Sequence, residues 1–387
     1  MTQRVLLTDT HWRTSYYVCK SLAKRNIDVI GLSSAESIYE RSIYYTDVLS
    51  LPSLELYPRE WLDRVEQIAN ENDILLPISP QAIKLVAFSK AQFAKKILTP
   101  PTPSSQIEFA LDKSKTLKYM ANIGIPIPLT FFPRSFDEVL DVIDQTKFPV
   151  VLKLNQEENI PPLQRYGIAR NLDELKEIYR VLSSIQTSLI MQQYIKGDGV
   201  GISILANNGI ILASYAHRRL REASVKGGPS TYASYFDSSV LRDYALSFAE
   251  KSKWSGLAML EFKYDHQSDS YCFMEINPRF WGTVELAIKS GIDFPYLFLE
   301  WIRGNNNVNR VKQKKIRLKY LSMDLAAFSF SLHDMNNAER LRSILSYARE
   351  YFDPDLHYNI DLKDWQVSLW ELVRSSQVLG SVIRHSI

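Results

Sequence analysis

The chain has 387 residues, of which 45% are hydrophobic and 23% are charged, and its formal net charge is +3 at pH 7. That length corresponds to roughly two to three ordinary domains, and the even charge balance gives no reason to expect a nucleic-acid partner. The two cysteines, Cys19 and Cys272, lie far apart without ligand spacing, so they indicate neither a disulfide framework nor a zinc site. The sequence contains no run of eighteen apolar residues, so it predicts no transmembrane segment, and we expect a cytoplasmic protein.

The first block of the chain, residues 1–104, alternates short apolar runs with segments of helical spacing. The runs "RVLLTDT", "IDVIGLS" and "DILLPIS" are separated by stretches such as "EWLDRVEQIANEN". This alternation predicts a small parallel sheet with helical crossovers. The first turn has no GxGxxG pattern, so we expect no dinucleotide site. Prolines and serines in "LTPPTPSSQ", residues 98–106, predict a domain boundary.

The next block begins with an expected subdomain at residues 105–196. Asp112 or Ser114 can cap a helix that ends near Gly124. The apolar strand "FPVVLKLN" is interrupted by Lys153, whose burial is costly unless an anion meets its ammonium group. The alternative is that this side chain reaches solvent. The run "LIMQQYI" is predicted to be an edge strand.

Longer alternating runs predict antiparallel strands in a second subdomain, residues 197–305. Here "NNG" predicts a hairpin turn, and "GDGVG" predicts a bend between the subdomains. The strand that ends in "HRRLRE" places Arg219 and Arg221 on one face and Arg218 on the other. With Lys226 nearby, these arginines could bind an anion, and the alternative is a solvated strand end.

A second hairpin, "LAMLEFKYDHQSDSYCFMEINP", carries acidic side chains on apolar strands. If its loop centres on Gln267 and Ser268, then Glu261 and Glu275 fall within about one residue of direct opposition, and Asn277 shares the face of Glu275. Two carboxylates ~4 Å apart repel by on the order of 4 kcal/mol at an effective dielectric of ~20, so we expect a cation between them. Carboxylate and amide oxygens suit magnesium. The alternative is a half-exposed strand pair whose glutamates meet water or lysine.

The last block, residues 306–387, contains helical patterns such as "AERLRSILSYAREYF" and "DWQVSLWELVRSSQVLG". No chemistry can be assigned to these patterns. We expect them to pack on the core, and the alternative is an amphipathic surface for a partner or a membrane.

The "EINPR" motif, with a glutamate on the preceding strand, is similar to the ATP-grasp superfamily, particularly its carbamoyl-phosphate-synthase-like and carboxylate-amine ligase members. The resemblance spans residues 1 to about 305. It implies a mixed α/β and α+β fold with an N-terminal flavodoxin-like pre-ATP-grasp parallel-sheet domain, an ATP-grasp domain made of two subdomains, and a helical C-terminal region. It also implies ATP with Mg²⁺, or with Mn²⁺ in its place.

The resemblance implies a role for each matching residue. The metal would be held by Glu261, Glu275 and Asn277, and the ATP phosphates by Lys113 and Lys153. Adenine would meet the Gln192 side chain and the backbone of Gln193 and Ile195, with Asp198 near the ribose. Arg279 would face the reacting phosphoryl group, and Arg219 and Arg221 would face the carboxylate or acyl phosphate of the acceptor.

The chemistry implied is phosphoryl transfer onto a carboxylate, followed by attack of an amine on the acyl phosphate. Small-molecule carboxylate and amine substrates are therefore expected, and a homodimer is left open. One departure from the family is "NQEENIPPLQRYGIA", residues 155–169, where Gly167 alone replaces a glycine-rich flap. This departure is the ground for one alternative, a non-catalytic ATP-binding regulatory protein. A second alternative is a kinase on the same fold with a hydroxyl acceptor.

Overall fold

The computed structural model describes residues 3–157, 160–161, 164–223, 228–306, 312–333 and 335–373. Its contacts divide the chain into two compact units. Unit 1 comprises Met1–Pro101, Leu212–Ser238 and Phe280–Ile387, and unit 2 comprises Thr102–Ile211 and Ser239–Arg279. Each unit is made of segments that are separated in the sequence. The domains expected above are instead continuous stretches of the chain, and their boundaries stay a prediction. None of the described helices is long and apolar enough to cross a membrane.

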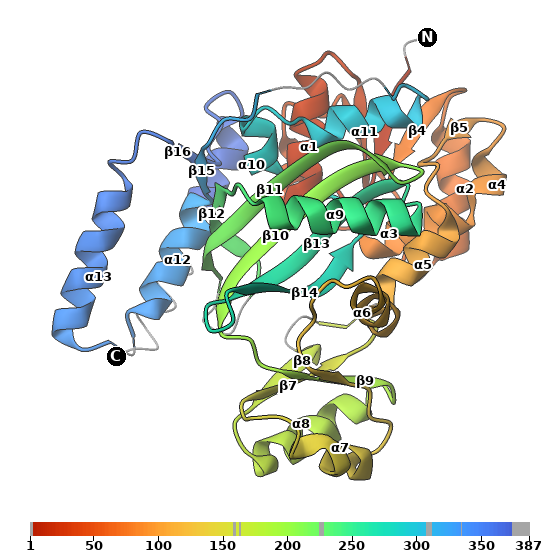
Figure 1. The fold of residues 1–387 in the computed structure, drawn as a ribbon. Coiled ribbons are helices and arrows are strands. Elements are labelled where there is room, and N and C mark those ends of the chain that lie inside the picture. The colour runs from red at the N-terminus through yellow and green to blue at the C-terminus, as the bar shows by residue number, and fades with distance from the viewer. Residues whose placement is uncertain are drawn as a thin grey trace. The chain divides into compact units, whose positions relative to one another are not determined.

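Unit 1 begins with a five-stranded parallel sheet in the order β3-β2-β1-β4-β5, which confirms the predicted sheet with crossovers (Figure 1). Parallel neighbours need a long connection, and helices supply it here. The elements are β1 (Val5–Leu7), α1 (Arg13–Ala23), β2 (Val29–Ser33), η1 (Ile38–Arg41), β3 (Asp47–Ser50), α2 (Pro58–Ile68), β4 (Asp73–Leu76), α3 (Pro80–Phe88), α4 (Lys90–Phe93) and β5 (Ile97–Leu98).

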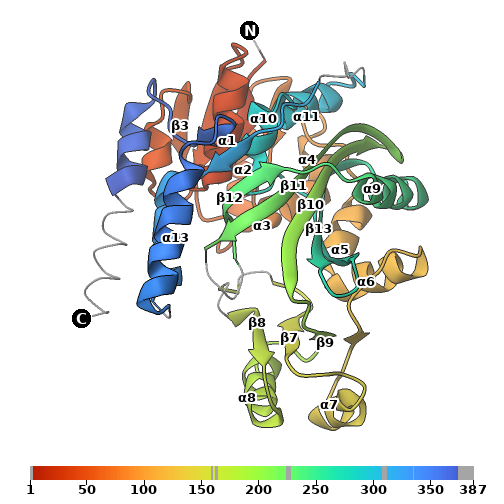
Figure 2. The ribbon, with the colours of Figure 1, turned by 60° about the vertical axis from the view of Figure 1, so that its left-hand side comes forward.

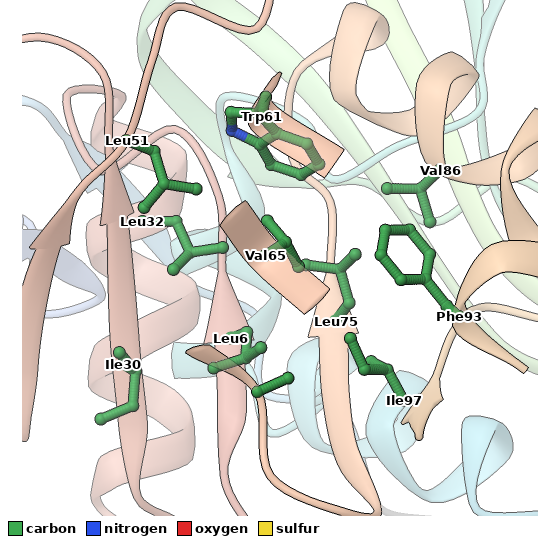
Figure 3. Packing of buried hydrophobic residues seen from close by; sticks show 11 residues of the cluster. Leu6, Ile30, Leu32, Leu51, Trp61, Val65, Leu75, Val86, Phe93 and Ile97 are labelled. Atoms are coloured by element: carbon green, nitrogen blue, oxygen red, sulfur yellow. The ribbon is translucent and has the colours of Figure 1, made fainter. Parts of the chain in front are cut away.

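The core of this sheet gathers side chains from several strands under helix α2 (Figure 3). Trp61 and Val65 lie four residues apart and therefore share one face of α2, and both are buried. They belong to the same apolar cluster as Leu6 of β1 and Leu75 of β4. Burying one such side chain contributes roughly 1.5–3 kcal/mol, so this cluster anchors the first part of unit 1.

The rest of unit 1 comes from later parts of the chain. Strands β11 and β12 are antiparallel, β12 and β15 are antiparallel, and β15 and β16 are parallel. The elements are β11 (Ile210–Glu222), β12 (Ser230–Tyr235), α10 (Val284–Lys289), α11 (Phe294–Ile302), β15 (Arg317–Lys319), α12 (Leu321–Ser331), α13 (Asn337–Glu350) and β16 (Leu356–Tyr358), followed by helical residues 365–373.

Polar contacts join the C-terminal residues of unit 1 to its N-terminal part. Lys20 Nζ of α1 lies 3.3 Å from Glu285 Oε1 and 3.1 Å from Asp361 Oδ2. The Tyr39 hydroxyl donates to Glu371 Oε1 at 3.0 Å. The segment that carries Asp361 and Glu371 therefore packs on the core of unit 1, as the sequence predicts. Helix α13, by contrast, exposes Leu341, Ile344 and Leu345.

Unit 2 contains an antiparallel sheet in the order β6-β9-β7-β8, and helices α7 and α8 lie on the same side of it (Figures 1 and 2). Apolar residues at alternate positions of β7, such as Val150, Leu152 and Leu154, belong to the buried cluster between this sheet and the two helices. Strand β9 lies inside this sheet, because the short β6 pairs with its outer side. The expectation of an edge strand at "LIMQQYI" is therefore wrong.

The second part of unit 2 is built on strands β10, β13 and β14, all antiparallel. Asn208 and Gly209 have φ of 47° and 87°, which confirms the hairpin turn predicted at "NNG". The bend expected at "GDGVG" is wrong, because these residues pair as a strand. A Cβ atom at Gly197 would lie 1.8 Å from the Tyr264 carbonyl oxygen, so this glycine permits close strand pairing.

The elements of unit 2 are α5 (Ser104–Leu111), α6 (Lys113–Asn122), β6 (Thr130–Phe131), α7 (Phe136–Ile143), β7 (Val150–Leu154), β8 (Tyr166–Ala169), α8 (Leu172–Ser183), β9 (Leu189–Gln193), β10 (Gly197–Asn207), α9 (Ser239–Ser252), β13 (Gly256–Asp265) and β14 (Ser270–Asn277).

Candidate functional site

Two carboxylates lie opposite each other on the β13–β14 hairpin of unit 2. Glu261 and Glu275 are direct cross-strand partners, which confirms the predicted opposition. The register shifts just after this pair, between Glu261 and Phe262. Such bulges re-aim side chains and are frequent beside active sites. The Asn277 Nδ2 atom donates to Glu275 Oε1 at 3.1 Å, so the three predicted metal ligands lie together.

Lys113 is held beside these carboxylates by the way helix α6 begins. Asp112 caps the helix, since its Oδ1 accepts from the Lys115 N–H at 3.0 Å. The Ser114 N–H donates to Asn155 Oδ1 at 2.7 Å, which fixes the helix start to the residue after β7. Lys113 is the first residue of the helix, where the helix dipole disfavours a cation. Carboxylates must therefore offset that cost.

Two carboxylates contact the Lys113 ammonium. Its Nζ lies 2.9 Å from Glu275 Oε2, and it also forms an ion pair with Glu157. Burial alone would lower the pKa of Lys113, but the charges of Glu275 and Glu157 raise it above its ordinary value. A cation was expected beside the opposed glutamates. Lys113 of the same unit supplies one positive charge there, next to Glu275.

Lys153 lies in β7 and is only 8% exposed. In the described part of the chain, no carboxylate comes within ion-pair distance of its ammonium group. Burial, and next the charge of Lys113, lowers the pKa of Lys153 to about 8. A buried lysine without a carboxylate partner fits the prediction that an anion binds at its tip.

Arg279 closes the opposite end of the cluster. Its Nη2 donates to Asn277 Oδ1 at 3.0 Å, and burial lowers the pKa of Arg279 although Glu275 and Glu261 oppose that effect. Asn277 therefore presents its nitrogen to Glu275 and its oxygen to Arg279. A metal ion that Glu275 and Asn277 shared would take the Asn277 amide oxygen, which accepts from Arg279 in this structure.

The donor set fits a hard cation held jointly with phosphates. Among the residues that the structure describes, no three carboxylate, imidazole or thiol side chains come together as a metal cage. Two glutamates and one amide leave several positions of an octahedral magnesium ion to water and phosphate oxygens. This sharing is the usual arrangement for magnesium at a nucleotide site.

Three of the four residues predicted to hold adenine and ribose have partners within unit 2. Gln192 is buried, and its Nε2 donates to Thr130 Oγ1 at 2.8 Å. The Gln193 N–H donates to the Leu129 carbonyl at 2.9 Å, because β9 is an interior strand. Ile195 follows the end of β9. Asp198 Oδ2 lies 3.2 Å from His266 Nε2. Their roles toward a nucleotide stay predictions.

In unit 1, a β-bulge separates Arg219 and Arg221. Arg219 pairs with Ala233 and Arg221 with Tyr232, which are consecutive residues and point to opposite faces. The expectation that both arginines share one face is therefore wrong. Lys226, which was expected beside them, lies outside the described residues.

Arg221 takes part in an ion-pair network of unit 1. Its Nη1 lies 2.6 Å from Asp324 Oδ2, and its Nη2 lies 2.9 Å from Glu350 Oε1. Lys319 Nζ lies 2.6 Å from Glu350 Oε2. Burial raises the pKa of Asp324, although Arg221 opposes the shift. Arg219 Nη1 lies 3.1 Å from Glu222 Oε1.

Sequence reasoning missed Glu157 and Arg165. Glu157 contacts Lys113, and Glu157 Oε2 lies 3.1 Å from Arg165 Nη1. The sequence held one hint: Glu157 is an acidic residue in the segment 155–169, where the resemblance places a glycine-rich flap over the phosphates. Gly167, the one glycine there, is needed for packing, because a Cβ atom would lie 2.7 Å from Ile178 Cγ2.

Comparisons with known proteins show what the chain resembles in sequence and in fold. Residues 185–323 match the family model described as ATP-grasp in the biosynthetic pathway with Ter operon. The chain is 25% identical over 380 residues to the carbamoyl phosphate synthase large chain of Sulfurisphaera tokodaii, covering 92% of this chain and 32% of that protein. It therefore spans about a third or less of the length of the curated relatives that it matches.

Two solved structures show the same fold at low identity. The biotin carboxylase domain of Hydrogenobacter thermophilus 2-oxoglutarate carboxylase, in complex with MgADP, ADP and bicarbonate, has a TM-score of 0.65 at 14% identity, covering 81% of this chain and 72% of that chain. The L-amino acid ligase of Bacillus licheniformis has a TM-score of 0.62 at 14% identity, covering 81% and 79%. The protein thus has the ATP-grasp fold, and its resemblance to the carbamoyl-phosphate-synthase-like members of the ATP-grasp superfamily is confirmed.

Proposed function

We propose that the protein is an ATP-dependent ligase that activates a carboxylate as an acyl phosphate and joins it to an amine. The observation that carries this proposal is the direct opposition of Glu261 and Glu275, with Lys113 contacting Glu275 and the buried Lys153 in the same unit. Paired carboxylates beside two lysines suit a metal–triphosphate complex. The related solved structures include one bound to MgADP and one L-amino acid ligase, which supports the same chemistry.

In the proposed reaction, Lys113 and Lys153 bind the ATP phosphates, and Arg279 orients the phosphoryl group that is transferred. Glu261, Glu275 and Asn277 would hold a magnesium ion, which would supply positive charge next to the terminal phosphates. A carboxylate oxygen of the substrate attacks the γ-phosphorus in line, and the bond to the ADP oxygen breaks. The amine nitrogen then attacks the acyl carbon, inorganic phosphate leaves, and the nitrogen loses a proton to solvent. An amide remains.

Within this proposal, Gln192, Gln193, Ile195 and Asp198 hold the nucleoside. The two arginines of β11 divide their roles. We assign Arg221 a structural role, because two carboxylates, Asp324 and Glu350, hold it. Arg219, which pairs with Glu222, stays the candidate for the acceptor carboxylate and would have to exchange that partner.

One observation favours a second candidate, a nucleotide-binding protein without turnover. Glu157 lies where a glycine-rich flap would offer backbone N–H groups, and it contacts the proposed phosphate-binding Lys113. The chain would then bind ATP and release no ADP with any acceptor.

A magnesium-dependent ADP-release screen separates these functions. The full chain is incubated with ATP and pairs of amino acids, peptides or organic acids, and the Glu275→Gln variant serves as the inactive control. ADP release that requires both a carboxylate and an amine supports the ligase. A phosphorylated product without an amine indicates a kinase. ATP binding without ADP release across the screen indicates the non-catalytic protein.

A further inference from the structure

We propose that Glu157 is a specificity-determining residue that occupies the phosphate position at Lys113 until a polyphosphate displaces it. The inference rests on the proposed function, since it assumes that Lys113 binds nucleotide phosphate. It adds a residue that neither the motif pattern nor the predicted site contains.

The contacts of Glu157 place a carboxylate firmly against the lysine. One oxygen pairs with Lys113, and the other lies 3.1 Å from Arg165 Nη1. Arg165 is fixed in turn, because its Nε donates to the Ile160 carbonyl at 2.8 Å. The side chains of Lys113 and Glu157 are 13% and 26% exposed, so water screens this pair less than it screens a surface pair.

A carboxylate and a phosphate oxygen compete for the same ammonium group. A phosphate that approached Lys113 with Glu157 in place would meet a like charge within contact distance. Any ligand whose phosphates reach Lys113 must therefore displace Glu157. A ligand without phosphates has no such requirement and leaves the contact intact.

When a phosphate binds the Lys113 ammonium group, the two carboxylate partners of Lys113 are affected differently. Glu275 exchanges the lysine for the metal ion that the proposed function assigns to it. Glu157 has no such replacement. Among the described residues it keeps its ion pair with Arg165, and its charge also acts on Lys153 and Arg279. The Glu157 contact is therefore a cost that ATP must offset and adenosine avoids.

The test compares ATP with adenosine on the full chain. Dissociation constants for ATP with Mg²⁺, in the absence of any acceptor, and for adenosine are measured by equilibrium dialysis. Glu157→Gln keeps the side-chain shape and removes the charge, so we expect ATP to bind roughly 5- to 30-fold more tightly, with adenosine unchanged within about twofold. The matched control is Glu177→Gln, which removes an exposed glutamate of the same unit that pairs with Arg180. We expect it to change neither constant.

A second measurement needs no nucleotide. A double-mutant cycle with Lys113→Met and Glu157→Gln, read by urea unfolding of the free protein, should show favourable coupling between the two side chains. Zero coupling overturns the proposal.

The binding outcomes also separate the two ideas. Weaker or unchanged ATP binding in Glu157→Gln overturns the role of Glu157, while wild-type ATP binding leaves the proposed function standing. A wild-type chain that binds no ATP overturns both.

Discussion

Raising the pH from 7 to 9 should weaken ATP binding about tenfold through Lys153 alone. Burial, and next the neighbouring Lys113, lowers the pKa of Lys153 to about 8, although the charges of Glu275, Glu157 and Glu261 act in the opposite direction. Phosphate groups have a second pKa near 6, so ATP itself changes its charge little above pH 7. The ammonium form of Lys153 is the form that binds phosphate, so ATP binding takes up a proton wherever Lys153 is neutral.

The magnitude follows from the charged fraction of Lys153. With a pKa of about 8, that fraction is roughly nine-tenths at pH 7 and one-tenth at pH 9. The tenfold loss of affinity corresponds to about 1.4 kcal/mol. At pH 8, binding should take up about half a proton.

Folding stability should move in the opposite direction. The unfolded lysine titrates near its ordinary value of 10.5, so between about pH 8 and 10.5 the unfolded chain binds more protons at this residue than the native chain. The contribution of Lys153 to the free energy of unfolding therefore rises with pH across that window, by on the order of 3 kcal/mol. A rise in pH thus weakens ligand binding while it removes a cost of folding.

Titration calorimetry at pH 7, 8 and 9, in two buffers that differ in ionisation enthalpy, measures both the affinity and the proton uptake. Lys153→Met should bind ATP weakly at every pH, and its proton uptake should disappear. A constant wild-type affinity between pH 7 and 9 would refute the reasoning, as would a pH profile that persists in Lys153→Met.

Three further outcomes are expected. Glu275→Gln should abolish turnover while circular dichroism and the melting temperature show a folded protein, and full activity in that variant would exclude a metal role for this carboxylate. Arg221→Met should lower the free energy of unfolding by about 3 kcal/mol in urea titrations, because it leaves the buried Asp324 with a weaker partner, and ATP affinity should stay within about twofold. Trp61→Ala should cost about 3–5 kcal/mol in the same assay, since it removes the largest side chain of the cluster under α2, and a loss below 1 kcal/mol would contradict that packing.

Much of the site was predictable because its determinants are local in sequence. Alternation along a strand decides which side chains share a face, and the four-residue loop decides which residues lie opposite each other. Those two rules bring Glu261 to within one residue of Glu275 and put Asn277 on the face of Glu275, and the bulge after Glu261 completes the direct opposition of the two glutamates. Lys153 was recognisable for a related reason, since burying a charged side chain in an apolar strand is costly unless an opposite charge or water meets it.

Other expectations failed where a distant segment decided the outcome. One extra residue in β11 moved Arg219 and Arg221 to opposite faces, and alternation cannot foresee a bulge. Strand β9 became an interior strand because the two residues of β6 pair with it across about sixty positions of sequence.

The sequence alone determined the alternating pattern of the strands, the pairing of the two glutamates to within one residue and the buried lysine, because these depend on neighbours within one hairpin or one strand. Only the tertiary structure decided that Glu157 meets Lys113, 44 positions away, and that Arg221 meets Asp324 and Glu350. Such contacts depend on how separate elements pack. The packing of separate elements decides which cation a carboxylate contacts, and the residue pattern along one element does not predict that contact.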